Sequence, residues 1–183
     1  MNWEEYLNDI WIERLVWVRQ LITSIMLNQR DLNLVARRVE RNATELGQIL
    51  ADVYGEEAGK NFQNLLSKYI VTLSIVVTTI KSGKNTDILM EQWLASAGEI
   101  AESLSQLNPY WDKSVVESLI RDQIQLEFDF ASDLKKENFG QGIANFDVAY
   151  DNARKASRLM IDGIKMHLGL ENPSSQQNTQ GNL

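Results

Sequence analysis

The sequence contains no cysteine, one histidine and two prolines among 183 residues. Without cysteine the chain has no disulfides, thiolate metal sites or cysteine nucleophiles, and a single histidine, His167, excludes every site that needs two imidazoles. Two prolines and ten glycines are too few turn residues for a β-sandwich or barrel made of many short strands. The composition therefore favours long helices and removes much catalytic chemistry.

Positive charge is also in short supply, with 18 Lys and Arg against 25 Asp and Glu and a net charge of −7. An acidic chain gains little from the counterion release that drives nonspecific binding to nucleic acid. The start of the chain carries Glu4 and Glu5 where a secretory signal would be basic. The uncharged run 69–80 is shorter than the roughly 18 residues of a membrane span. We expect a cytoplasmic protein whose partners include neither nucleic acid nor a membrane.

Apolar residues recur at a spacing of three and four through most of the chain, which predicts helices. The pattern predicts long helices over about 3–28, 56–82, 86–107, 114–134 and 143–164, and a two-part helical connection over 32–40 and 44–54. The predicted fold is all-α, an antiparallel up-and-down helical bundle of four to five long helices plus that short connection. We expect one domain, residues 1–170, followed by a disordered polar tail, residues 171–183.

Several helix ends are marked by residues that cap or stop helices. Gly55 is a C-terminal stop, and Asn85 or Thr86 is expected to cap the helix that follows. Ser114 and Glu117 have the spacing of a capping box. Two glycines are expected to interrupt the chain before the last helix, namely Gly140 and Gly142.

The run 70–80 is rich in Ile, Val and Thr, which by propensity favours a strand. A lone strand would leave its backbone groups without partners, so we expect a helix. This helix is apolar on more than one face. It is therefore expected either to run through the centre of the bundle or to lend Val71 and Ile75 to a homodimer interface.

Known motifs for cofactors are missing from the sequence. It has neither the spaced glycines of a dinucleotide fold nor the Gly-Lys-Ser/Thr of a nucleotide site, and it cannot form two Glu-x-x-His pairs for a di-iron centre. His167 is expected at a helix terminus, with no role as a metal ligand or a base. We predict no cofactor and no metal. The tryptophans at helical spacing are expected to pack in the core.

Polar side chains interrupt the apolar stripes at three places. Arg14 lies on the stripe of the first helix, Tyr69 on that of the 56–82 helix and Gln123 on that of the 114–134 helix. A buried arginine needs a carboxylate, because an unpaired charge in a core costs several kcal/mol. The candidate partners are Glu127, Asp147 and Asp151. The sequence leaves open whether this layer only fixes helix register or holds a ligand.

Short segments along most of the chain share their type and order with a known group of proteins. They are Val-Arg-Gln-Leu-Ile-Thr-Ser at 18–24, Tyr-Gly-Glu-Glu-Ala at 54–58, Leu-Leu at 65–66, Trp93 with Glu-Ile-Ala at 99–101, Leu-Asn-Pro-Tyr-Trp at 107–111 and Tyr-Asp at 150–151. The chain resembles a family of small all-helical proteins of Gram-positive bacteria that often carry the label acetylglutamate kinase. We reject that activity, because an amino-acid kinase is a larger α/β protein whose glycine-rich loops hold ATP.

The resemblance also implies an internal site. Members of this family tend to carry inward histidines, and the corresponding positions here are Arg14, Tyr69, Gln123 and Arg154. The replacements imply that no metal binds, with Arg14 in the place of a cation and paired to an acid such as Asp151. The predicted ligand-binding layer consists of six residues: Arg14, Tyr69, Gln123, Glu127, Asp151 and Arg154.

Two functions from different classes follow. The first is a noncatalytic cytoplasmic interaction or binding module, whose partner is another protein or a second copy of the chain. The alternative is a small-molecule or metal-binding bundle, with or without enzymatic activity, that uses the inward polar layer. A cavity ringed by Arg14, Tyr69 and Gln123 would favour the alternative, and a filled layer would favour the first.

Overall fold

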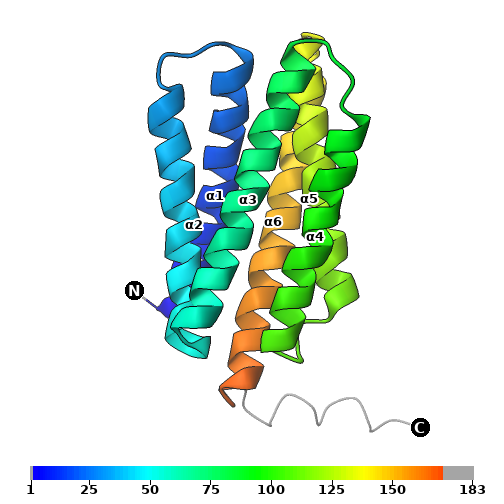
Figure 1. Cartoon of the computed structure of the whole chain (residues 1–183). Helices are drawn as coiled ribbons and strands as arrows, with labels where there is room; N and C mark the ends of the chain where they lie inside the picture. The colour runs from blue at the N-terminus through cyan, green and yellow to red at the C-terminus, as the bar shows by residue number, and fades with distance from the viewer. Residues whose placement is uncertain (1, 171–183) are drawn as a thin grey trace, which may run out of the picture.

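A computed structural model describes residues 2–170, which form six α-helices joined by short turns. Consecutive helices run in opposite directions, so the predicted all-α antiparallel bundle is confirmed (Figure 1). The described residues contain no strand. The expected disordered tail, residues 171–183, lies outside the described residues. The helices are α1 (Trp3–Met26), α2 (Leu32–Tyr54), α3 (Glu56–Lys81), α4 (Asp87–Leu107), α5 (Lys113–Lys135) and α6 (Phe139–His167).

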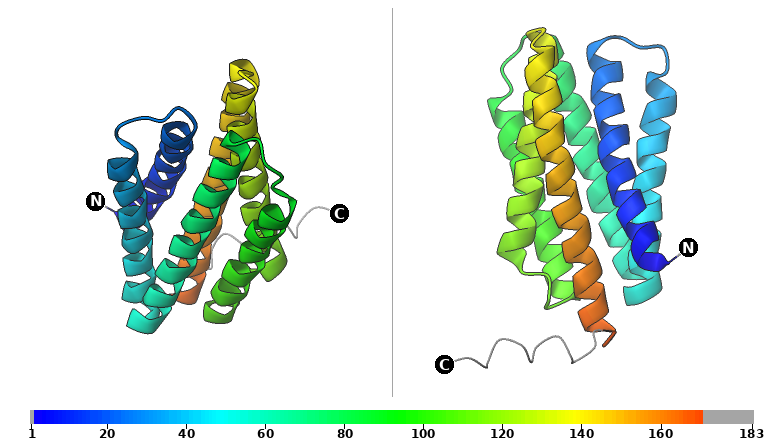
Figure 2. Two further views of the ribbon diagram at one scale, coloured as in Figure 1. Left: turned by 45° about the horizontal axis from the view of Figure 1, so that its top comes forward. Right: turned by 180° about the vertical axis from the view of Figure 1, so that it is seen from behind.

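The six helices form a closed bundle in which α1, α3 and α5 are the inner helices and α2, α4 and α6 are the outer ones. Helices α1, α3 and α5 contact one another, and α2 packs between α1 and α3. In the same way, α4 packs between α3 and α5, and α6 packs between α5 and α1 (Figure 2). Because neighbours along the chain are antiparallel, the three inner helices are parallel to each other. Each inner helix therefore presents one face to a common axis.

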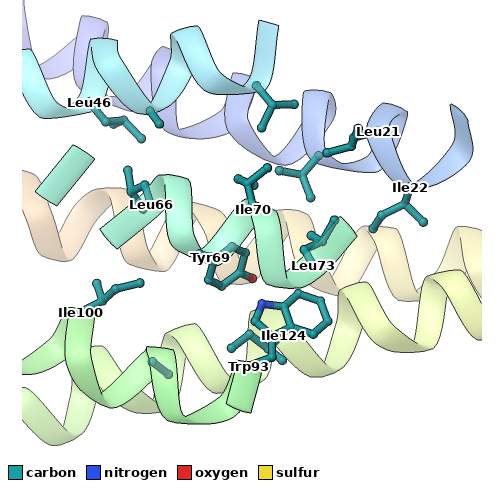
Figure 3. Close-up of a cluster of buried hydrophobic side chains, with 14 of the residues drawn as sticks. Leu21, Ile22, Leu46, Leu66, Tyr69, Ile70, Leu73, Trp93, Ile100 and Ile124 are labelled. Atoms are coloured by element: carbon teal, nitrogen blue, oxygen red, sulfur yellow. The ribbon is translucent and has the colours of Figure 1, made fainter. Parts of the chain in front are cut away.

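The core follows this axis from end to end. Its largest fully buried side chains come from all six helices and from the turn before α5. Figure 3 shows part of it, with Tyr69 and Trp93 among aliphatic side chains. Burying a side chain of leucine size contributes roughly 1.5–3 kcal/mol, so this core dominates the stability of the bundle. Of the four tryptophans at helical spacing, Trp93 is 0% exposed and lies in the core as predicted, whereas Trp3, Trp11 and Trp17 are half-buried at its edge. Trp111, in the turn before α5, is also 0% exposed.

The two-part connection predicted over 32–54 is wrong, because α2 is one continuous helix of 23 residues. The polar stretch that suggested a break contains Asn42, a weak helix former. Its side chain is fully buried and donates a hydrogen bond of 2.9 Å to the carbonyl of Ile10 on α1. A tertiary contact therefore stabilises the helix where its own propensity is low. The predicted stop at Gly55 is confirmed, since this residue ends α2 with φ of 94°.

Helix starts follow the sequence less closely. The side chain of Asn85 accepts a 2.8 Å hydrogen bond from the backbone of Asp87 at the start of α4. The capping box predicted at Ser114 is wrong. The cap of α5 is Asp112, whose carboxylate accepts a 3.0 Å hydrogen bond from the backbone of Val115, while Ser114 already lies inside the helix. An aspartate two residues earlier is an equally good cap, and only the backbone conformation decides between them.

The glycines near 140 do not interrupt the chain. Helix α6 begins at Phe139 and runs through Gly140 and Gly142. Gly142 is buried against Phe130 of α5, and a Cβ there would lie 3.4 Å from the ring. This is an ordinary van der Waals distance, so Gly142 lies in a normal helix–helix contact between α6 and α5.

The segment 70–80 is helical, as predicted, and lies within α3. Among the described residues α3 is the one helix whose length and composition would also allow a membrane span. In the bundle it contacts α1, α2, α4 and α5, which accounts for much of its apolar surface. Its remaining face carries Val71 and Ile75, which are 59% and 48% exposed. Central packing therefore covers α3 only in part, and a homodimer through this face stays a prediction.

Candidate functional site

The three inner helices each place polar side chains at the middle of the bundle. Arg14 comes from α1, Tyr69 from α3, and Gln123 and Glu127 from α5. Tyr69 is 3% exposed and Glu127 is 7% exposed. Four of the six predicted residues thus meet where α1, α3 and α5 converge. Together with Asn152 of α6 we call them the central polar layer.

Glu127 is the acceptor at the centre of this layer. The hydroxyl of Tyr69 donates to its Oε2 over 2.7 Å, and Nε2 of Gln123 donates to its Oε1 over 3.0 Å. Asn152 in turn donates to Oε1 of Gln123 over 3.2 Å and to the carbonyl of Leu119 over 2.9 Å. Both carboxylate oxygens of Glu127 are therefore hydrogen-bonded, and the network joins α3, α5 and α6.

Arg14 stands apart from this network. Its guanidinium lies 5.2 Å from the centre of the Tyr69 ring, as in a cation–π contact. The side chain is half-buried as a whole, but its Nη1 is fully buried and has no hydrogen-bond partner in the described part of the chain. The predicted pairing with Glu127, Asp147 or Asp151 is wrong, because within residues 2–170 Arg14 forms no ion pair. Asp147 and Asp151 lie on the exposed face of α6.

Burial shifts the pKa of each ionisable group in the layer. It lowers the pKa of Arg14, against the charges of Tyr69 and Glu127, although an arginine stays protonated at neutral pH. It raises the pKa of Glu127, against the hydrogen bond from Tyr69 and the charge of Arg14. Burial, with the charge of Glu127, also raises the pKa of Tyr69 well above its usual range. The layer therefore holds a partly desolvated cation whose Nη1 has no acceptor within residues 2–170.

A cavity of about 80 Å³ lies beside the layer. Its polar end consists of the five residues of the central polar layer, and its other walls are apolar. A cavity of about 150 Å³ holds benzene, so this one has room for a few waters or a molecule of a few atoms. The remaining lining residues are Trp11, Leu15, Phe62, Leu66, Ile100, Leu104, Val116, Leu119, Ile120, Ala156, Leu159 and Met160.

A second cavity, of about 20 Å³, shares Gln123 and Glu127 with the first. On its wall the guanidinium of Arg19 lies 4.6 Å from the ring centre of Phe130 and 4.1 Å from that of Phe146. Both aromatic rings thus hold the cation by cation–π contacts. This cavity has room for about one water, so the first is the better candidate for a ligand.

The predictions for Asp151 and Arg154 are wrong, because both side chains are exposed. They line a surface groove between α1 and α6. At helical spacing, Ile143 and Tyr150 predict an inward face together with Ala153 and Ser157, but the first two are 59% and 39% exposed, whereas Ala153 and Ser157 are buried. The true inner face carries mostly small residues and includes Asn152, which sequence reasoning missed. That stripe of small residues was the available signal: Gly142, Ala149, Ala153, Ser157 and Gly163.

Other polar groups that the sequence singled out lie outside the layer. No three His, Cys, Asp or Glu side chains in residues 2–170 come together to hold a metal ion. His167 lies in the last turn of α6, with its ring 4.8 Å from that of Tyr54, so its predicted terminal position is confirmed.

No protein-family model, curated protein or solved structure matches the chain. A function is therefore inferred from the geometry of the central polar layer and its cavity.

Proposed function

We propose that the chain is a small-molecule-binding helical bundle whose ligand occupies the cavity beside the central polar layer. The observation that carries this proposal is the buried Nη1 of Arg14, a donor on the wall of a largely apolar cavity that finds no acceptor among residues 2–170. A buried donor left unsatisfied costs about 1–3 kcal/mol, and more when it is charged. A ligand that supplies an acceptor removes this cost in the bound state only, which is a source of affinity.

The rest of the layer supports binding over a purely structural role. A buried polar group in a folded protein finds its partner in the protein itself or in a molecule bound beside it. Glu127 and Gln123 find theirs in the protein through the hydrogen bonds given above, whereas Nη1 of Arg14 finds none within residues 2–170. Apolar walls with a few polar groups at one end are typical of small-molecule sites. The site is also built on helices, which hold it more rigidly than loops would.

The arrangement of the layer supports a role in recognition. Glu127 accepts one hydrogen bond on each oxygen, from Tyr69 and from Gln123, and these bonds fix the position of its carboxylate. Within residues 2–170, Nη1 of Arg14 has no hydrogen-bond partner, so it is free to contact a ligand. We therefore assign the layer to recognition of the ligand.

Thermal unfolding in the presence of small probes tests the proposal. We would add propionate, propionamide and 1-propanol separately to the protein and to two variants. Ala156→Leu fills the cavity, which Ala156 lines, and Ala95→Leu adds the same bulk on the exposed face of α4 as a control. A ligand at about ten times its Kd stabilises by roughly 1.4 kcal/mol. For a chain of this size, that raises Tm by about 3–5 °C.

The proposal expects at least one probe to raise the Tm of the parent and of Ala95→Leu, but not that of Ala156→Leu. Equal shifts in all three proteins would place binding outside the cavity and contradict the proposal. No shift with any probe would contradict it too.

A further inference from the structure

We infer that the ligand is a small aliphatic carboxylate, with its carboxylate on Arg14 and its short chain between the apolar walls of the cavity. The inference rests on the proposed function and names the chemical class of the ligand. Three features of the site lead to it: the charge of the unsatisfied group, the identity of the groups already satisfied, and the size of the cavity.

The unsatisfied group is a cation. Within the described residues Arg14 forms no ion pair, and its guanidinium lies 5.2 Å from the centre of the Tyr69 ring. A carboxylate matches the planar fork of a guanidinium with two parallel hydrogen bonds. Hydrogen bonds between two ions are about twice as strong as those between neutral groups. A neutral acceptor such as an amide would satisfy Nη1 but leave the buried charge without a counter-ion.

The other polar groups at this end of the cavity are engaged with each other. Glu127 accepts from Tyr69 and Gln123, and the side-chain oxygen of Gln123 accepts from Asn152. These residues therefore do not compete for the carboxylate of a ligand. Glu127 also carries the same charge as the proposed ligand, which favours a position of the carboxylate on the Arg14 side of the layer.

The cavity limits the ligand to a few atoms. Its volume is about 80 Å³, roughly half of the 150 Å³ that holds benzene. Acetate and propionate, with four and five non-hydrogen atoms, are of the right size. The walls beyond the polar end include Leu66, Ile100, Leu104 and Met160. Such walls favour a methyl or ethyl group over a hydroxylated chain, because a buried hydroxyl would lack a partner.

Methyl NMR on the intact chain tests the inference, because Met160 lines the cavity. Met26, which is buried outside the cavity, and Met166, which lies near the end of α6, serve as internal references. The protein with ¹³C-labelled methionine methyls is titrated with propionate and, separately, with propionamide. The two probes have nearly the same shape and differ in charge. Five non-hydrogen atoms give micromolar affinity at best, so concentrations up to about 20 mM are needed.

We expect propionate to shift the Met160 methyl signal in a saturable way, while the signals of Met26 and Met166 do not move. The Kd for propionate from this titration should be at least tenfold lower than the Kd for propionamide. In Arg14→Met the preference for propionate falls to less than threefold. Arg154→Met is the matched control on the exposed face of α6, and it should keep the parent preference. If Arg14→Met does not fold, the comparison of propionate with propionamide on the parent protein still tests whether the ligand is a carboxylate.

Two results would overturn the inference, and they differ in what they leave standing. Equal affinity for propionate and propionamide at Met160 would contradict the inference that the ligand is a carboxylate, but it would leave the proposed small-molecule site standing. No change at Met160 with either probe would overturn both the ligand class and the proposed function.

Discussion

Tyr69 on α3 donates a hydrogen bond of 2.7 Å to Glu127 on α5, at the point where the three inner helices meet. The face of the same tyrosine ring lies 5.2 Å from the guanidinium of Arg14 on α1. One side chain thus contacts a buried anion through its hydroxyl and a buried cation through its ring. Each oxygen of Glu127 accepts a hydrogen bond, whereas Nη1 of Arg14 has no hydrogen-bond partner within residues 2–170.

The first prediction concerns pH and Glu127. Its pKa in the folded protein is raised by burial above the value of the unfolded chain. Below the unfolded value, near 4.3, the group is protonated in both states and its full contribution to stability is present. As pH rises from there through the folded pKa, the folded state binds more protons than the unfolded state and stability is lost. Relative to Glu127→Gln, the parent should therefore lose unfolding free energy over this range.

Chemical denaturation of both proteins between pH 4 and pH 8 measures this difference. Each unit by which the pKa is raised corresponds to about 1.4 kcal/mol. Asp122→Asn, a change at an exposed site on the same helix, is the control and should run parallel to the parent. A difference that stayed constant, or that grew in favour of the parent with rising pH, would contradict the assigned direction of the pKa.

The second prediction concerns the coupling of Arg14 and Glu127. Arg14→Met leaves the Glu127 carboxylate without the cation of the layer, but it also removes a buried donor that has no partner within residues 2–170, so the loss of unfolding free energy at pH 7 should stay below about 2 kcal/mol. The double variant Arg14→Met/Glu127→Gln should be less destabilised than the sum of the two single variants. A double-mutant cycle in urea measures the interaction, expected at about 0.5 kcal/mol or more. Strict additivity would show that the two charges do not interact.

The third prediction concerns the contact between α2 and α3. A Cβ on Gly59 would lie 2.4 Å from the carbonyl oxygen of Gly47 and 2.6 Å from the Cβ of Ala51. Gly59→Ala must push the helices apart, and we expect a loss of about 3 kcal/mol. Gly140→Ala meets nothing within 4 Å and should gain roughly 0.5–1 kcal/mol from helix propensity. The denaturant midpoints of the two variants should move in opposite directions. A shift of both midpoints in the same direction would contradict the close contact of α2 and α3 at Gly59.

The fourth prediction concerns the outer face of α3. Val71 and Ile75 are 59% and 48% exposed, so Val71→Lys/Ile75→Lys should keep the fold within about 1 kcal/mol of the parent. Leu73 lies between them and is 0% exposed. Leu73→Lys should therefore cost more than about 4 kcal/mol. Circular dichroism measures the fold and sedimentation measures the association state. A parent that is a dimer and a folded double variant that is a monomer would identify the face as an interface. An unfolded double variant would show that this face is buried.

Periodicity predicted the inward positions of Arg14, Tyr69 and Gln123 correctly. Their helices, α1, α3 and α5, are the inner ones, and each carries a broad apolar stripe that faces the common axis. A polar residue within such a stripe must point the same way as its neighbours. The sequence could not show that Arg14 lacks a carboxylate, since this depends on distances between helices that the spacing within one helix does not fix.

Helix α6 shows where the same reasoning fails. Ile143 and Tyr150, at helical spacing, predict an inward face, but they are exposed. The helix packs instead through small residues around Ala149 and Ala153, which allow close approach to α1 and α5. Residue size is thus a poor guide to the inner face where helices pack closely. This error placed Asp151 in the layer and left Asn152 out of it. Membership of the Gram-positive family stays a prediction.

A crystal structure of the protein grown with propionate tests most directly the claim that the cavity binds a small molecule. We expect electron density for the probe in the cavity, with a carboxylate oxygen about 2.7–2.9 Å from Nη1 of Arg14 and the ethyl group near Met160. The contradicting result is a cavity that holds only a water bridging Arg14 to the Tyr69–Glu127 pair, with no density for propionate even in crystals grown at a high concentration of the probe.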